Sequence, residues 1–118
     1  MGLQLAARAG RACTVVEVGG QVDMATGPEL HDFLQQVTAG KGGPQLVLDL
    51  ADVSFLDSSG LGVLLVWFKE LHGAGGRLCV AGLQEPVASV LRLTAVDQVL
   101  DVYDSVEAAE ADMPPVAS

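Results

Sequence analysis

The middle of the chain has a nearly continuous apolar run, followed after a polar connection by a helix that is apolar on nearly every side. The run occupies residues 46–50, and strands buried on both faces of a sheet have this composition. The helix follows Asp57-Ser58-Ser59-Gly60 and is mostly apolar as far as Leu71, with Lys69 and Glu70 as its charged residues. A doubly buried strand next to such a helix predicts a layered α/β domain.

Strands and helices alternate along the rest of the sequence. We predict strands at residues 3–7, 12–18, 46–50, 78–81 and 99–103. We predict helices that begin near Thr26 or Gly27 and at residues 58, 86 and 105. The order predicts a single α/β domain with a mixed, mostly parallel sheet of four to five strands and about four helices. We expect this domain to span residues 1–111, with a flexible tail at residues 112–118.

Composition narrows the classes of partner. The chain has 118 residues, half of them hydrophobic, with 6 Lys and Arg against 15 Asp and Glu, a net charge of −9. Nucleic-acid binding and attachment to an anionic membrane both need clusters of cations, so we expect neither. No stretch is long enough to cross a membrane, and a cytoplasmic location is expected.

Cysteines and histidines give little support for an enzyme. Cys13 and Cys79 lie in apolar stretches without CxxC spacing, which favours two buried free thiols and leaves a disulfide open. A serine hydrolase would need a base, and His31 and His72 both fall in predicted helices, with His72 expected on the core side. No spacing suggests a metal site. We therefore expect no catalytic residue, no metal and no cofactor.

The helix over residues 58–72 has two apolar sides. At 100° per residue, one side carries Leu61, Leu64, Leu65, Phe68 and Leu71. The opposite side carries Gly62, Val63 and Val66, with Trp67 on the flank. We expect Val63, Val66 and Trp67 to form a surface for a partner protein. Coverage by neighbouring helices is the alternative.

The start of this helix permits two interpretations. Asp57, Ser58 or Ser59 suits the N-cap position, where a side-chain oxygen accepts a backbone N–H. A serine here also suits phosphorylation, because a helix N-terminus carries partial positive charge. Gly60 and Gly62 would leave the backbone open to close approach by another protein.

The central segment resembles a known family. Residues 48–64, with Asp57-Ser58-Ser59-Gly60 after a buried strand, resemble the signature of the STAS domain, named for sulfate transporters and anti-sigma factor antagonists. Segments 20–23, 75–78 and 91–94 also fit the family pattern, so the resemblance covers about residues 3–110. The length is similar to that of stand-alone bacterial anti-sigma factor antagonists.

This resemblance implies a switch between partners. An unphosphorylated antagonist binds an anti-sigma factor that is also a serine kinase, and a sigma factor is released. The kinase then phosphorylates the serine that matches Ser58, and a metal-dependent serine phosphatase reverses the step. The expected partner-binding residues are Asp23, Asp57, Ser59, Gly60, Gly62, Val63, Val66 and Trp67. The alternative is a STAS module that is not phosphorylated, in a stress-sensing scaffold or a lipid-transport assembly.

Overall fold

The computed structural model describes residues 2–42 and 44–113. One sheet has the order β1-β2-β3-β4-β5, in which β1 is antiparallel to β2 and the other neighbours are parallel. This confirms the predicted α/β fold with a mixed, mostly parallel sheet. In chain order the elements are β1 (Gln4–Ala9), β2 (Thr14–Val22), α1 (Gly27–Thr38), β3 (Gln45–Leu56), α2 (Ser58–Gly73), β4 (Arg77–Ala81), α3 (Glu85–Leu93), the short 3-10 helix η1 (Val96–Gln98), β5 (Asp101–Tyr103) and α4 (Val106–Ala111).

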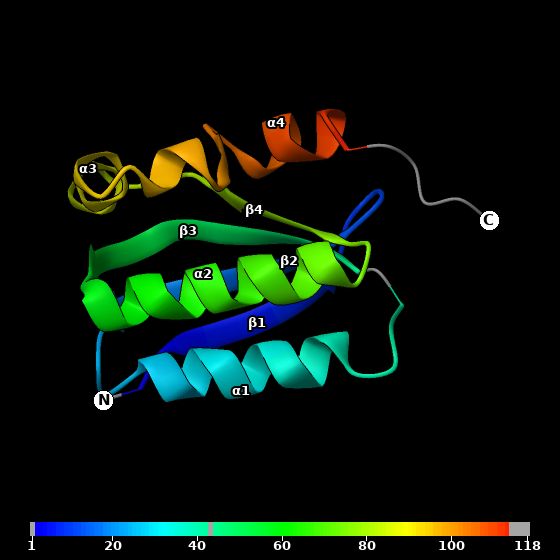
Figure 1. Ribbon diagram of the computed structural model, residues 1–118, viewed down its shortest axis with the longest axis horizontal. Helices are drawn as coiled ribbons and strands as arrows, with labels where there is room; N and C mark the ends of the chain where they lie inside the picture. Colours follow the sequence, from blue (N-terminus) through cyan, green and yellow to red (C-terminus); the bar gives the residue numbers. More distant parts are fainter. Residues whose placement is uncertain (1, 43, 114–118) are drawn as a thin grey trace.

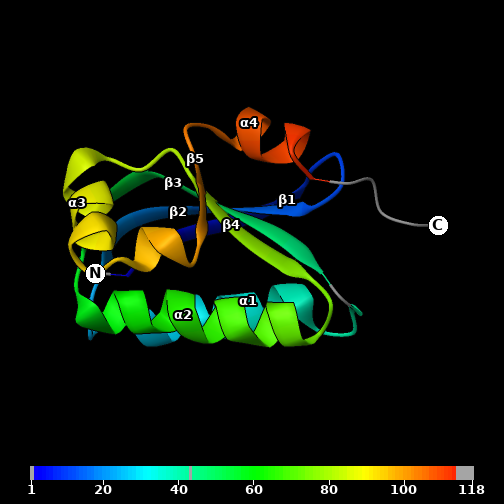
Figure 2. The same ribbon diagram turned by 45° about the horizontal axis from the view of Figure 1, so that its top comes forward.

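Helices cover both faces of the sheet. Helices α1 and α2 lie side by side on one face, α4 lies on the other, and α3 lies near the end of β3 (Figures 1 and 2). Successive side chains of a strand point to opposite faces. Leu46 and Leu48 therefore join the larger core under α1 and α2, whereas Val47 joins a smaller core under α4. The apolar run at residues 46–50 is thus explained by burial on both faces.

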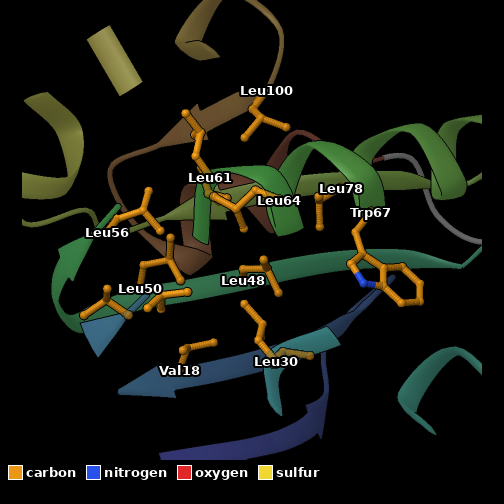
Figure 3. Close-up of a cluster of buried hydrophobic side chains, with 14 of the residues drawn as sticks. Val18, Leu30, Leu48, Leu50, Leu56, Leu61, Leu64, Trp67, Leu78 and Leu100 are labelled. Carbon is orange, nitrogen blue, oxygen red and sulfur yellow. The ribbon is translucent and has the colours of Figure 1, made fainter. Parts of the chain in front are cut away.

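Most of the buried apolar volume lies between the sheet and the α1–α2 layer. Leu48, Leu64 and Trp67 are among its members, and Figure 3 shows them between α2 and the strands. Leu30 and Leu34 contribute from α1, and both are almost fully buried. The two helices are therefore fixed against the sheet by one shared core, which sets the relative position of their outer surfaces.

Strands β2 and β3 run well past their predicted ends. We expected Gly19 and Gly20 to end the second strand, but β2 continues to Val22 through a β-bulge at this point. Gly20 has φ of 115°, which a residue with a side chain rarely adopts, so the Gly-Gly pair allows the bulge. Strand β3 likewise continues to Leu56. As a result, both strands deliver their last residues to the same edge of the sheet.

The C-terminal part of the domain is longer than predicted, and the last strand is shorter. Met113 is only 6% exposed and packs in the smaller core, and Tyr103 donates a hydrogen bond to the carboxylate of Asp112. The expectation that residue 112 begins a flexible tail is therefore wrong for these two residues, and residues 114–118 lie outside the described part. The predicted strand at 99–103 is reduced to β5, because Val99 and Leu100 form a turn after η1 in which both of their N–H groups donate to the Val96 carbonyl.

The two cysteines are free thiols. Cys79 on β4 pairs with Val47 of β3, which pairs with Val15 of β2, two residues after Cys13. Two strand spacings amount to about 10 Å, beyond the Cα separation of about 7 Å that a disulfide allows. This excludes the disulfide that the sequence left open. Cys13 is half-buried, whereas Cys79 is fully buried.

Alkylation should distinguish the two thiols. Burial raises the pKa of Cys79 to about 11, so its reactive thiolate is scarce near neutral pH and the sulfur is inaccessible. With iodoacetamide at pH 8, we expect Cys13 to be modified first and Cys79 only after denaturation, as followed by mass spectrometry. Cys13→Ser serves as the control, and rapid native labelling of that variant would contradict the burial of Cys79.

Candidate functional site

The site begins where β2 and β3 end together. Val22 and Leu56 are paired in the parallel ladder, and each is followed directly by an aspartate, Asp23 and Asp57. The Asp57 N–H donates to the Val22 carbonyl over 3.2 Å, which joins the two strand ends. Open α/β sheets place binding sites at the carboxyl ends of their strands. The two carboxylates that the sequence singled out thus leave the sheet at one edge.

Asp57 is the N-cap of α2. Its Oδ1 accepts the N–H of Ser59 over 2.9 Å and the N–H of Gly60 over 3.0 Å. Of the three residues that the sequence suggested for the N-cap, Asp57 therefore occupies this position. Ser58 and Ser59 are both exposed, and neither accepts a capping hydrogen bond at the start of α2. The hydroxyl of Ser58 therefore stands at the first turn of α2 with no capping role.

Gly60 faces the interior of the domain. A Cβ at this position would lie 2.6 Å from the Val22 carbonyl oxygen and 2.6 Å from Cδ1 of Leu56. The expectation that Gly60 opens the backbone to a partner is therefore wrong, because β2 and β3 already occupy that space. Gly62 differs, since a Cβ there would meet nothing within 4 Å.

Trp67 also turns inward. It is 7% exposed, and its Nε1 donates to Nδ1 of His31 over 3.0 Å. The expectation that Trp67 contributes to an exposed partner surface is therefore wrong. The reason is that α1 packs beside α2 and covers this flank, which is the alternative that the sequence left open. The buried side of α2 is accordingly formed by Leu61, Leu64, Trp67 and Leu71, with Leu65 and Phe68 only half-buried.

A groove of about 520 Å3 lies between the outer surfaces of α1 and α2, next to the carboxyl edge of the sheet. Met24, 78% exposed, and Val66, 48% exposed, give it an apolar surface. Sequence reasoning missed Met24 and His31, which lie in or before α1 rather than on α2. The predicted residues that line this α1–α2 groove are Asp23, Ser59, Gly62, Val63 and Val66.

The match to a protein family covers most of this structure. The family model described as STAS domain matches residues 4–109. The chain belongs to the STAS domain family. The match runs from β1 into α4, so it includes both strand ends, the N-cap of α2 and the α1–α2 groove.

Named relatives of this STAS domain include anti-sigma factor antagonists. It is 32% identical over 87 residues to an anti-sigma-B factor antagonist of Bacillus subtilis, covering 74% of this chain and 78% of the relative. The crystal structure of an anti-sigma factor antagonist from Mycobacterium paratuberculosis is similar with a TM-score of 0.81 and 28% identity, covering 93% and 95% of the two chains. The Bacillus cell fate determinant SpoIIAA in its phosphorylated form shares the fold, with a TM-score of 0.67 and 20% identity over 94% and 99% of the chains.

Asp23 holds the loop that leads into α1 of this STAS domain. Its Oδ1 accepts the N–H groups of Ala25 and Thr26, each over 3.0 Å, and the Thr26 hydroxyl accepts the N–H of Asp23. These bonds, the Thr26 N–H first, lower the pKa of Asp23. Ionised Asp23 therefore supports the folded loop above the pKa of an unfolded aspartate, and this support is lost as the pH falls through the lowered value.

Other candidate chemistry finds no support in the described part of the STAS domain. No group of His, Cys, Asp and Glu among residues 2–42 and 44–113 could hold a metal ion. Within the same residues, no helix has the length and apolarity to cross a membrane. His72 is exposed and stacks on Phe68, with ring centroids 5.8 Å apart, so its predicted place on the core side is wrong.

Proposed function

We propose that this STAS domain is an anti-sigma factor antagonist that is switched by phosphorylation of Ser58. In the unphosphorylated state it binds an anti-sigma factor and a sigma factor is released. Phosphorylation of Ser58 by that anti-sigma factor, acting as a serine kinase, ends the complex. The observation that carries this proposal is the exposed Ser58 hydroxyl, free of any capping role, beside the α1–α2 groove.

The charges around Ser58, at the carboxyl edge of the sheet, favour control of binding by phosphorylation. A phosphate adds about −1.5 to −2 charge at neutral pH. The N–H groups of Ser59 and Gly60 already bond to Asp57, so the first turn of α2 has little left to neutralise the phosphate. A docked partner would have to desolvate this dianion close to Asp57. We expect the phosphate to reduce the binding free energy by about 2 to 3 kcal/mol, which is on the order of a hundredfold in affinity. The reason is that the partner surface fits a serine hydroxyl and not a dianion.

The rest of the cycle is part of the same proposal. The antagonist has no catalytic role, and a metal-dependent serine phosphatase restores the free Ser58 hydroxyl. Regulation of a sigma factor places the chain in the cytoplasm. Asp23, Ser59, Gly62, Val63 and Val66 contact the anti-sigma factor through the α1–α2 groove.

Affinity capture with and without ATP tests this proposal. The immobilised chain is exposed to extract of its own organism, and bound proteins are identified by mass spectrometry. The expected result is retention of one anti-sigma factor, here called the cognate anti-sigma factor, and its loss when ATP is added. Retention of a partner that ATP does not release, with Ser58 unmodified, would favour the unphosphorylated scaffold module instead.

Val66→Glu should separate binding from folding. Val66 is 48% exposed in the groove, so a carboxylate there costs little in the free protein but would be desolvated against a docked partner. We expect the melting temperature to stay within a few degrees and the affinity for the purified cognate anti-sigma factor to fall at least tenfold.

Lys69→Gln is the matched control for Val66→Glu. It changes the net charge by the same −1 on an exposed position of α2 outside the groove. We expect its affinity, measured by calorimetry, to stay within about twofold of the unaltered chain. Equal losses for the two variants would show that overall charge, and not the groove, governs binding.

A further inference from the structure

The hydrogen bond between Trp67 and His31 fixes which imidazole nitrogen carries the proton. The indole N–H is only a donor, so the nitrogen that it meets, Nδ1 of His31 at 3.0 Å, must be unprotonated. In neutral His31 the proton is therefore on Nε2. The indole is buried and its ring lies 5.4 Å from the imidazole, so the imidazole is held in one orientation.

The Nε2–H of His31 has no acceptor within the described chain. His31 is half-buried and lines the α1–α2 groove, and the bond from Trp67 is the one hydrogen bond of its imidazole among residues 2–42 and 44–113. A partner that fills the groove removes water from this N–H. A donor that is desolvated without an acceptor costs free energy, so a fitting partner must supply one.

The surroundings define the kind of acceptor. Asp23 and Asp32 line the same groove, so an additional carboxylate from a partner would be repelled. The exposed side chains of Met24 and Val66 suit an apolar side chain. The partner segment that fits has an apolar side chain, a neutral carbonyl oxygen beside it, and a Lys or Arg to pair with the two aspartates.

We propose that His31 is a specificity-determining residue of the α1–α2 groove, which donates from Nε2–H to a neutral carbonyl oxygen on such a segment of the cognate anti-sigma factor. This inference rests on the proposed function. Trp67 acts as the positioning residue, because its N–H selects the His31 tautomer and orients the ring.

Two substitutions at His31 test the roles of Nδ1 and Nε2 separately. Asparagine keeps an oxygen near the place of Nδ1 for Trp67 but has nothing that reaches as far as Nε2. Glutamine carries its amide N–H about as far as Nε2 and loses the acceptor for Trp67. His31→Asn should keep the melting temperature and bind the purified cognate anti-sigma factor about tenfold more weakly. His31→Gln should melt earlier but retain most of the affinity.

The experiment measures affinity by calorimetry and the tautomer by 15N NMR of the imidazole at pH 8, with Gln35→Asn as control. Gln35 is exposed one turn further along α1 and outside the groove, so its variant should bind like the unaltered chain. Full affinity of His31→Asn, or a proton found on Nδ1, would overturn the role of His31 alone. Absence of binding by the unaltered chain would overturn the proposed function, and this inference with it.

Discussion

Ser58→Ala should abolish phosphorylation and leave binding intact, whereas Ser58→Asp should weaken binding to the cognate anti-sigma factor at least tenfold. The hydroxyl of Ser58 is exposed and caps nothing, because Asp57 is the N-cap, so alanine removes no hydrogen bond that α2 needs. Aspartate places a negative charge beside Asp57, as a phosphate would, but with a smaller charge. Its effect should therefore be weaker than that of phosphorylation.

Labelling with radioactive ATP and the purified cognate anti-sigma factor measures the first effect, and calorimetry measures the second. Ser54→Ala is the control, since Ser54 is an exposed serine outside the α1–α2 groove. It should still accept about one phosphate per chain. Stoichiometric labelling of Ser58→Ala would place the modification at another residue.

Gly60→Ala should destabilise the domain by about 1 to 3 kcal/mol, the range for forced insertion of a methyl group into a packed site. The added Cβ would lie 2.6 Å from the Val22 carbonyl oxygen, and the backbone at the end of β2, which is paired with β3, moves less easily than a side chain. The contact lies at the junction between β2 and the first turn of α2. Denaturant unfolding followed by circular dichroism gives the change in free energy of unfolding.

Gly62→Ala is the control, because it makes the same substitution two residues further along the same helix. A Cβ at Gly62 meets nothing within 4 Å, and alanine is favoured over glycine within a helix by about 0.5 to 1 kcal/mol. We expect this variant to be as stable as the unaltered chain or more stable. If both variants unfolded at the same denaturant concentration, Gly60 would not be the tight contact described above.

The sequence predicted the order of elements because each element has its own local signal. The apolar run at residues 46–50 and the i, i+3, i+4 spacing of Leu30, Phe33 and Leu34 in α1 are patterns within one short segment, so the sequence alone shows them. The ends of β2 and β3 were harder to predict. Glycine is common where strands end, so Gly19 and Gly20 suggested the end of a strand. Only the pairing with β3 shows that they form a bulge inside β2.

The site residues likewise divide into those that a local pattern marks and those whose placement depends on contacts between distant elements. A cap at Asp57, Ser58 or Ser59 was predicted because capping is a local property, whereas Ser58 was singled out only by the resemblance to the STAS signature. The orientation of Trp67 depends on α1 packing beside α2, and the burial of Gly60 depends on Val22 and Leu56. Contacts between elements distant in sequence decide both, so a helical projection of α2 alone placed Trp67 incorrectly.

His31 and Met24 are groove residues that could not be identified from the sequence of one helix or loop alone. From the sequence, His31 was considered only as a candidate catalytic base, because no neighbouring residue indicated that its imidazole accepts a hydrogen bond from Trp67. Met24 follows Asp23, yet a lone apolar residue in a loop has no periodic pattern to mark it. Both became visible only when the fold brought α1 beside α2.

The most direct measurement compares the affinity of the cognate anti-sigma factor for two forms of the unaltered chain, with and without phosphate on Ser58. Incubation with the kinase and ATP gives the phosphorylated form, and mass spectrometry verifies one phosphate at Ser58. We predict that its dissociation constant is about a hundredfold higher than that of the unphosphorylated form. Equal dissociation constants for the two forms would contradict a switch at Ser58.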